Sequence, residues 1–277
     1  MKPSQVNPTS LAPLLRWAGS KRKLLPHLIS NSPTRFVRYV EPFAGSACLF
    51  FALGPSKAIL GDFNRELIAF YEVVRRTPRA LFRCASEFPM SRDYYYELRS
   101  RDARTMSPIQ AAARFLYLNR FCFNGVYRTN RKGQFNVPFG TRTGTLPSLT
   151  HIENVSQMLR RADLTAADFG ETVQQVRRGD FVYIDPPYAA RRYRGEYGYG
   201  AFSLADTNRL SQVAEELDSK GATFLISYQH DRRIARQFRM WHQSRVSVRR
   251  HVAGFAGARG VVTELLISNM SFKGYKT

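Results

Sequence analysis

A strand–helix–strand pattern near the N-terminus constrains the fold of this chain more than any other feature. Residues 35–42 (RFVRYVEP) and 57–62 (KAILGD) are short apolar runs typical of buried strands, and residues 45–53 (GSACLFFAL) between them predict a short apolar helix. Because the pattern spans only about 28 residues, it favours two parallel strands joined by a right-handed crossover. Helical spacing resumes in residues 64–76.

The same alternation returns in the second half of the chain. Residues 204–220 have the spacing of an amphipathic helix. Strands are predicted at residues 164–168, 181–185, 222–227, 245–252 and 261–268, the last two as an antiparallel pair. We therefore predict an α/β fold with a Rossmann-like, mostly parallel sheet and helices on both faces.

The alternation is interrupted between residues 77 and 159, where arginine, tyrosine and asparagine dominate. This segment contains a predicted helix at residues 108–118, a predicted β-hairpin at residues 125–140 and a polar loop after it. We therefore expect two domains. One is built from residues 1–76 and 160–277, and the other is an inserted helical and β-hairpin domain, residues 77–159, whose surface contacts a partner.

The charge of the chain indicates what this partner is. The 277 residues include 34 arginines and eight lysines against 21 acidic residues, which gives a formal net charge of +21. Arginine makes two-point contacts with phosphate and with guanine edges, which lysine cannot make. A compositional bias of the source genome would raise arginine but would not leave acidic residues so scarce. Nucleic acid is therefore the first candidate.

Several other classes of protein are disfavoured. The sequence has no run of about 18 apolar residues that could span a membrane, and its first residues lack the apolar core of a signal peptide. Its three cysteines, Cys48, Cys84 and Cys122, are too scattered for a disulfide framework or a metal site, and the five histidines have no ligand spacing. We expect a cytoplasmic monomer with no metal and no membrane partner.

Carboxylates follow several of the predicted strands. In open α/β sheets, ligands bind beyond the carboxyl ends of the strands, where the turn containing Gly45 and the side chains of Asp62, Asp168 and Asp185 are expected. Asp62 follows Gly45 by 17 residues, close to the spacing at which a carboxylate binds ribose hydroxyls. An N-cap for the helix that follows Asp62 is the alternative, and it is compatible with ribose binding.

The order of several motifs resembles the adenine-specific DNA methyltransferases of the Dam type, the D12 class with the α order of motifs. The resemblance extends from about residue 14 to residue 270. It is carried by RWAGSK, VEPFAGSACLFF, GDFNRELI, LNRFCFNGVYRTNRKGQFNVPFG, YIDPPY and RRHV…RGVVTELLISN. The combination of W-A-G-x-K, N-G-x-x-R-x-N and D-P-P-Y is highly specific, whereas each of these motifs alone is not.

The resemblance implies that S-adenosyl-L-methionine is the cofactor. The residues implied to bind it are Trp17, Lys21, Phe43, Gly45, Asp62, Asp168, Phe169 and Asp185. Taken alone, Trp17 would be read as a packed surface side chain beside a solvated basic turn. The chain departs from the family at Ser20 and at Ala47, which replace common glycines. An alanine methyl at a close-approach turn would narrow the cofactor site.

The D-P-P-Y motif suits the methylation of an exocyclic amine, whose lone pair is delocalised into the ring. The Asp185 carboxylate and the Pro186 carbonyl would accept both N–H groups and expose the lone pair. Two prolines, Pro186 and Pro187, fix the turn and remove competing donors. Tyr188 offers a flat face for an extruded base. A simple strand-ending turn, with Tyr188 covering the core, is the alternative.

The predicted hairpin supplies candidate DNA contacts. They are Arg120, Asn124, Arg128, Asn130, Arg131 and Lys132. In the enzymes that this chain resembles, the asparagine of F-N-G helps to open the base pair, and the arginine four residues later reads guanine. Arg128 is thus our candidate for base reading, with a phosphate contact as the alternative. Residues 189–202, rich in Gly, Tyr and Arg, are expected to form a loop near the flipped base or a solvated basic loop.

These features predict a site-specific adenine methyltransferase that acts on the 6-amino group in duplex DNA, with GATC a plausible target. A 4-amino cytosine or RNA methyltransferase would use the same pocket, and an inert DNA-binding relative is a third possibility. Carbon-5 methylation of cytosine is disfavoured because it needs a nucleophilic cysteine that usually follows a proline. Here the three cysteines follow Ala47, Arg83 and Phe121.

Overall fold

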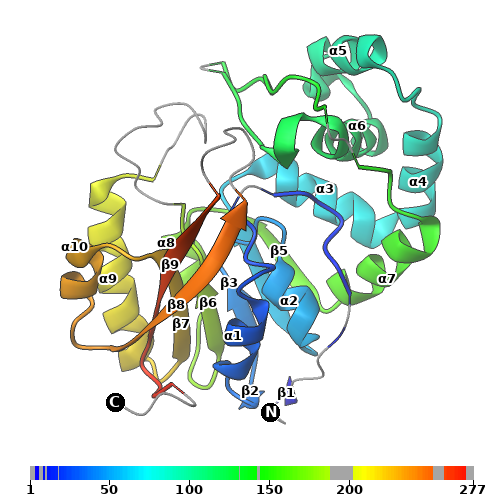
Figure 1. Ribbon diagram of the computed structural model, residues 1–277. Helices are drawn as coiled ribbons and strands as arrows, with labels where there is room; N and C mark the ends of the chain where they lie inside the picture. Colours follow the sequence, from blue (N-terminus) through cyan, green and yellow to red (C-terminus); the bar gives the residue numbers. More distant parts are fainter. Residues whose placement is uncertain are drawn as a thin grey trace.

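The computed structural model describes residues 4–5, 9, 11–17, 19–130, 132–141, 144–187, 202–251 and 259–272. Within them, a seven-stranded sheet has the order β5-β4-β3-β6-β7-β9-β8 (Figure 1). Its strands are β3 (Tyr39–Glu41), β4 (Ala58–Asp62), β5 (Ala162–Ala166), β6 (Phe181–Ile184), β7 (Thr223–Gln229), β8 (His242–His251) and β9 (Arg259–Ser268). The first five pair in parallel, and β9 runs antiparallel between β7 and β8. The predicted mostly parallel sheet is confirmed.

The strand order reverses at the centre of this sheet. The chain passes from β3 to β4 and β5 toward one edge, and then returns to β6 and β7 on the other side of β3. A crevice for ligands is expected at such a reversal, beyond the carboxyl ends of β3 and β6. Glu41 ends β3, and Asp185 directly follows β6.

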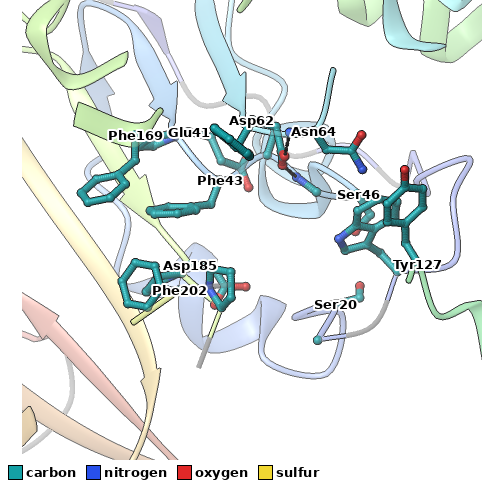
Figure 2. Close-up of a pocket in the computed structure, with 18 of the residues that line it drawn as sticks. Ser20, Glu41, Phe43, Ser46, Asp62, Asn64, Tyr127, Phe169, Asp185 and Phe202 are labelled. Carbon is teal, nitrogen blue, oxygen red and sulfur yellow. Dashed lines mark hydrogen bonds between the residues drawn. The ribbon is translucent and has the colours of Figure 1, made fainter. Parts of the chain in front are cut away.

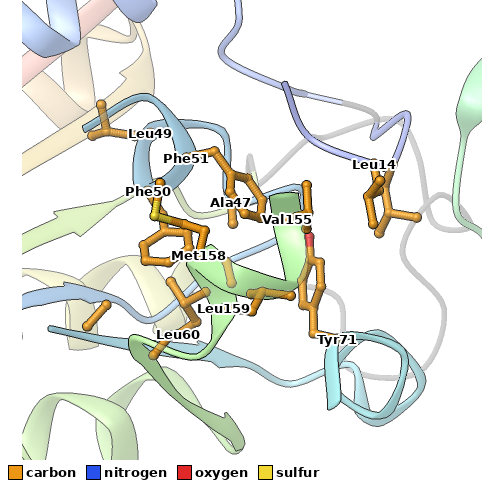
Figure 3. Close-up of a cluster of buried hydrophobic side chains, with 14 of the residues drawn as sticks. Leu14, Ala47, Leu49, Phe50, Phe51, Leu60, Tyr71, Val155, Met158 and Leu159 are labelled. Atoms are coloured by element: carbon orange, nitrogen blue, oxygen red, sulfur yellow. The ribbon is translucent and has the colours of Figure 1, made fainter. Parts of the chain in front are cut away.

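Alternation along the strands explains why helices cover both faces of the sheet. In β6, Phe181 and Tyr183 join the hydrophobic cluster on one face, whereas Val182 and Ile184 join the cluster on the other. The first face is covered by α1 (Leu25–Ser30), α2 (Cys48–Leu53) and α3 (Arg65–Arg76), as Figure 3 shows in part. The second is covered by α8 (Phe169–Gln174), α9 (Leu204–Ser219) and α10 (Arg232–Gln237) (Figure 1).

The inserted segment is more helical than its sequence predicts. It contains α4 (Pro78–Ser86), α5 (Arg92–Ser100), α6 (Pro108–Phe121) and α7 (Leu149–Leu159), with short 3-10 turns at Ala103–Thr105 and Phe123–Gly125. The helices α4, α7 and the first half of α6 share the cluster on the first face of the sheet. A further cluster joins α5, the end of α6 and the region of Phe135 and Val137. The main core thus continues into the insert, and a domain division at residues 77 and 159 remains a prediction.

The predicted hairpin is a short antiparallel turn. Thr129 forms a bridge with Phe135, and the Asn136 N–H donates to the Arg128 carbonyl at 3.1 Å. A second bridge joins Cys122 to Phe139, which ties the hairpin to the end of α6. At the N-terminus, β1 (Ser4–Gln5) and β2 (Arg35–Phe36) form a separate antiparallel pair.

Candidate active site

A cavity of about 560 Å³ lies at the carboxyl ends of β3, β4 and β6 (Figure 2). All the residues implied to bind the cofactor line it: Trp17, Lys21, Phe43, Gly45, Asp62, Asp168, Phe169 and Asp185. Pro186 and Pro187 line it too, whereas Tyr188 lies outside the described residues. Segments separated by more than a hundred residues therefore meet in one space at the reversal of the strand order.

Asp185 is held from one side by two donors. The Lys21 ammonium lies 2.7 Å from Asp185 Oδ1, and the Ser227 hydroxyl donates to the same oxygen at 3.0 Å. Among the described residues no group donates to the other oxygen, Oδ2. Burial raises the pKa of the Asp185 carboxyl above its ordinary value, and the Lys21 ammonium opposes this shift. The side chain is 18% exposed, so the carboxylate is accessible from the cavity that it lines.

Lys21 is buried beside the cavity. The resemblance implies that it binds the cofactor, and the structure places its ammonium in the ion pair with Asp185. The same ammonium also donates to the Gly19 carbonyl at 3.3 Å. A buried ammonium is stable only when it is paired and hydrogen-bonded, as it is here. The Lys21 ammonium is therefore engaged by Asp185 and by the Gly19 carbonyl.

Asp62 joins two turns at the floor of the cavity. Its Oδ2 accepts from the Gly45 N–H and its Oδ1 from the Asn64 N–H, both at 2.9 Å. The N-cap of α3 is Asn64, whose side chain accepts from the Leu67 N–H at 3.1 Å. The alternative that Asp62 caps this helix is therefore wrong. Burial raises the pKa of the Asp62 carboxyl, and the two backbone donors oppose the shift.

Trp17 is part of the cavity wall and not a surface side chain beside a solvated turn. Its ring stacks on Tyr127 with centroids 5.4 Å apart, and Tyr127 donates to Glu66 at 3.0 Å. Gly45, at φ +46°, approaches the indole so closely that a Cβ there would lie 3.1 Å from the ring. Any larger residue at position 45 would have to displace Trp17.

Aromatic rings gather at the opposite end of the cavity. Phe43 and Phe169 stack with centroids 5.1 Å apart, and Phe202 meets Phe43 edge-on at 5.9 Å. Figure 2 shows these three rings together, away from Ser20 and Tyr127. Asp168 caps α8 and forms an ion pair with Arg209, whose guanidinium lies 4.4 Å from the centre of the Phe169 ring.

Three residues in or beside the cavity make contacts that the sequence did not predict. Phe202 and Arg209 contact Phe169 from α9 or the residues before it, more than thirty positions later in the chain. Ser227 contacts Asp185 from the neighbouring strand. None of the three belongs to a motif, so only the pairing of β6 with β7 and the packing of α9 bring them to the site.

Ala47 does not narrow the site, contrary to the expectation from the family pattern. Its backbone is left-handed, at φ 51°, and its side chain packs in the cluster on the first face of the sheet (Figure 3). It is absent from the cavity wall, although both its neighbours, Ser46 and Cys48, are part of it. The left-handed backbone at position 47 points the Ala47 methyl group away from the cavity.

Ala47→Gly is therefore expected to leave the affinity for S-adenosyl-L-methionine unchanged within about twofold. Relief of left-handed strain, about 1–2 kcal/mol, is offset by the loss of a buried methyl, about 0.8 kcal/mol, and by the entropy of glycine, about 0.5–1 kcal/mol. The free energy of unfolding should change by less than about 1 kcal/mol. Titration calorimetry and denaturant unfolding measure both quantities, and a tenfold gain in affinity would contradict this placement of the methyl.

The five candidate DNA-contacting residues that the structure describes are not part of the cavity wall. The Arg120 guanidinium donates to the carbonyls of Thr145 at 2.8 Å and Leu14 at 3.3 Å, so it holds two segments of the chain together. Asn130 accepts from the backbone N–H groups of Lys132 and Gln134 and so stabilises the hairpin turn.

The other candidates differ in their surroundings. Arg128 donates to the Asn136 side chain at 2.8 Å, Asn124 has a left-handed backbone at φ 56°, and Lys132 is exposed. Arg131 lies outside the described residues, as do residues 189–201 of the predicted loop. Thr129 and Gly133 line the cavity, so the hairpin borders it.

The described residues offer no group of His, Cys, Asp and Glu that could hold a metal ion. No described helix is both long and apolar enough to cross a bilayer.

Comparison with known proteins agrees with this arrangement. The D12 class N6 adenine-specific DNA methyltransferase family matches residues 17–253. The type II methyltransferase M1.LlaDCHI of Lactococcus lactis subsp. cremoris is 35% identical over 277 residues, covering 96% of this chain and 98% of that protein. The DNA adenine methylases of Salmonella typhi and Escherichia coli (strain K12) are 32% and 31% identical over 263 residues, covering 91% of this chain and 93% of each relative. The chain belongs to the D12 class of adenine-specific DNA methyltransferases.

Proposed function

We propose that the chain transfers the methyl group of S-adenosyl-L-methionine to the 6-amino group of an adenine that has been rotated out of duplex DNA. The observation that carries this proposal is the hydrogen bonding of the two carboxylate oxygens of Asp185. One of its oxygens is anchored by Lys21 and Ser227, and the other receives no hydrogen bond from the described residues. Such a carboxylate is positioned to accept an N–H from a base in the adjoining cavity.

The cavity fits this methyl donor in charge and in size. Although the whole chain carries a net charge of +21, the cavity wall is acidic. Among the described residues that line it, six carry carboxyl groups (Glu41, Asp62, Glu66, Asp168, Asp185 and Asp206) and two are cations, Lys21 and Arg65. An acidic wall favours a ligand with a sulfonium and an ammonium group. The volume of about 560 Å³ lies within the range of pockets for nucleoside-sized ligands, about 300–1,000 Å³.

Separate parts of the wall suit separate parts of the donor. The rings of Phe43, Phe169 and Phe202 form an apolar wall for the purine. Asp62 keeps lone pairs on both oxygens after accepting two backbone N–H groups, and these can accept from ribose hydroxyls. When bound, S-adenosyl-L-methionine supplies an electrophilic methyl group on sulfur.

The chain then aligns the amine for direct transfer. Asp185 Oδ2 and the Pro186 carbonyl accept its two N–H groups, which draws the nitrogen toward tetrahedral geometry. Proline at positions 186 and 187 leaves no backbone N–H to compete for these acceptors. Tyr188 stacks on the base. Asp185 Oδ2 takes up the proton that the nitrogen loses, which a carboxyl with a raised pKa does readily.

The hairpin and the end of α6 are proposed to meet the DNA. Phe123, which is 38% exposed, and Asn124 stand side by side in the chain between α6 and the hairpin, where an aromatic ring can fill the space left by the extruded base. Lys132 and Arg131 are proposed phosphate contacts. Arg120 and Asn130 contribute mainly by holding this region in shape.

The test is transfer of labelled methyl from S-adenosyl-L-methionine to duplexes that contain or lack GATC, followed by sequencing that reads modified bases. The expected product is 6-methyladenine at one short motif, with GATC the proposed motif. Methylated cytosine, or label in RNA and not in duplex DNA, would overturn the assignment. Sedimentation of the purified chain tests the proposed monomer separately.

Arg128→Ala is expected to relax sequence choice. Loss of a two-point contact to guanine lowers discrimination at one position by about 1–3 kcal/mol, or roughly 5- to 150-fold. Methylation rates on duplexes with single-base changes measure this. Lys132→Ala, at an exposed residue of the same hairpin, is the matched control and should weaken all duplexes alike. Uniform weakening by Arg128→Ala would make it a phosphate contact.

A further inference from the structure

Behind Asp185 lies a chain of two buried hydroxyl groups. The Tyr183 and Ser227 hydroxyls are 2.8 Å apart, and Ser227 is 3.0 Å from Asp185 Oδ1. Tyr183 is 1% exposed, and Ser227 is fully buried. No motif of the sequence contains Ser227, and the cofactor cavity does not include it among its lining residues.

The pairing of two strands places these groups together. In the parallel ladder between β6 and β7, Tyr183 is opposite Leu225 and Ile184 is opposite Ile226. Continued by one step beyond the ladder, this register would bring Asp185 opposite Ser227, in agreement with their 3.0 Å contact. Side chains alternate along a strand, so positions 183, 185, 225 and 227 share one face of the sheet. The contact between Ser227 and Asp185 therefore follows from the register and not from a flexible loop.

Proton counting gives the hydroxyl chain one direction. An ionised carboxylate only accepts hydrogen bonds, so Ser227 must donate its one proton to Asp185. The Ser227 oxygen then accepts from Tyr183, whose own proton is thereby also used. Two buried hydroxyls are thus committed to a single oxygen of the carboxylate. A chain of this kind stabilises the charged form of Asp185 and not its protonated form.

We propose that Ser227, supported by Tyr183, is a positioning residue for methyl transfer: it holds Asp185 Oδ1 so that Oδ2 faces the base, and it keeps the carboxyl ionised. The inference rests on the proposed function, since it assigns Oδ2 to the amine. With the Ser227 hydroxyl removed, Lys21 would be the only described residue that holds Oδ1, and the carboxylate could turn about its Cβ–Cγ bond.

Other ionisable groups face Asp185 from the elements around it. They are Lys21 before α1, Glu41 at the end of β3, Cys48 in α2, Tyr183 in β6 and Glu264 in β9. Only Lys21 carries a positive charge among them, and the negative charge of Glu264 favours protonation of Asp185. Ser227 is therefore the one neutral donor that works with Lys21 against these neighbours among the described residues.

The test is the pH dependence of kcat for Ser227→Ala with saturating donor and DNA. Loss of a donor to the charged form raises the pKa of Asp185, and activity needs the ionised form, so the acid limb of the profile should move to higher pH by about one unit. At neutral pH kcat should fall about tenfold, while KM for the donor stays within about twofold. Ser227→Thr, which keeps the hydroxyl, should restore the acid limb.

Ser268→Ala is the matched control. Ser268 is also a buried serine in this sheet, but its hydroxyl donates to the Phe224 carbonyl at 2.6 Å and does not touch Asp185. It should lower stability without moving the acid limb. An unmoved acid limb in Ser227→Ala, or an equal shift in Ser268→Ala, overturns the proposal.

Two further outcomes can be told apart from these: a Ser227→Ala variant that does not fold, and a wild-type protein that is inactive. If Ser227→Ala does not fold, Tyr183→Phe tests the same chain of hydroxyls, because it removes the outer donor. Its acid limb should move in the same direction by a smaller amount, and an unmoved limb overturns the proposal. Wild-type protein that methylates no adenine would instead refute the proposed function, whatever the variants do.

Discussion

Asp185→Asn should lower methyl transfer by about a thousandfold at neutral pH, in line with the loss of one preorganised charged group at a reacting centre. Asparagine keeps the shape of the side chain but removes the negative charge that pairs with Lys21 and would accept the N–H of the base. Single-turnover transfer of labelled methyl to a duplex measures the change. Binding of the donor and of DNA should persist, since other residues of the cavity and of the hairpin supply most of those contacts.

The same strand offers a matched control at its other end. Asp180 precedes β6 as Asp185 follows it, is fully buried, and pairs with Arg38 at 2.7 Å. It lies at the amino end of β6, whereas the cavity lies at the carboxyl ends of the strands. Asp180→Asn should lower the melting temperature and leave kcat per folded molecule unchanged. If Asp185→Asn retains activity, or if Asp180→Asn loses as much, then Asp185 is not the acceptor of the amine.

The positions of four of the implied cofactor residues were predictable because they depend on local sequence. Gly45, Asp168 and Asp185 come shortly after a short strand and Asp62 ends one, and the carboxyl ends of parallel strands lie on one side of the sheet. The tight turns at these ends are encoded by glycine, proline and aspartate within a few residues. All eight implied cofactor residues therefore line a single cavity.

The contacts of these residues were not predictable from the same signals. Lys21 meets Asp185 across 164 positions, and Ser227 meets it across 42. Arg209 reaches Asp168 across 41 positions. Such pairs depend on strand register and on how helices pack, which no local pattern of one sequence specifies. The hydroxyl of a buried serine has no signature in the sequence at all.

Serine residues mark the starts of three helices of the insert. Ser91, Ser107 and Ser148 each cap a helix, and Ser107 forms a reciprocal capping box with Gln110. The sequence of α5 is rich in tyrosine and arginine, and only Tyr95 and Leu98 are buried in it. Its apolar spacing is therefore too weak to predict a helix. Its other tyrosines lie beside arginine side chains, with Arg99 4.7 Å from the Tyr96 ring centre. Serine caps were thus the better guide to this region than apolar spacing.

Lys21→Met should lower kcat about a hundredfold at neutral pH and move the acid limb of the pH profile upward by more than one unit. Methionine keeps the apolar stem but removes the charge that opposes the burial of Asp185, and an unpaired buried carboxylate costs about 3–5 kcal/mol. The pKa of Asp185 would rise further, so more of the carboxyl is protonated at neutral pH and fewer molecules can accept the amine. Because the ionised form returns as pH rises, activity should recover at alkaline pH.

The pH profile of single-turnover transfer at saturating donor separates this electrostatic role of Lys21 from a role in donor binding. If Lys21 only bound the donor, its substitution would raise the donor concentration needed for saturation and leave the acid limb of the pH profile in place. Lys220→Met is the matched control, since Lys220 pairs with Glu216 on the surface of α9, away from the cavity wall, where an ion pair contributes little. An acid limb that is identical in Lys21→Met and in the wild type would show that Asp185 does not depend on the ammonium group. The 2.7 Å contact would then have no part in keeping the Asp185 carboxylate charged.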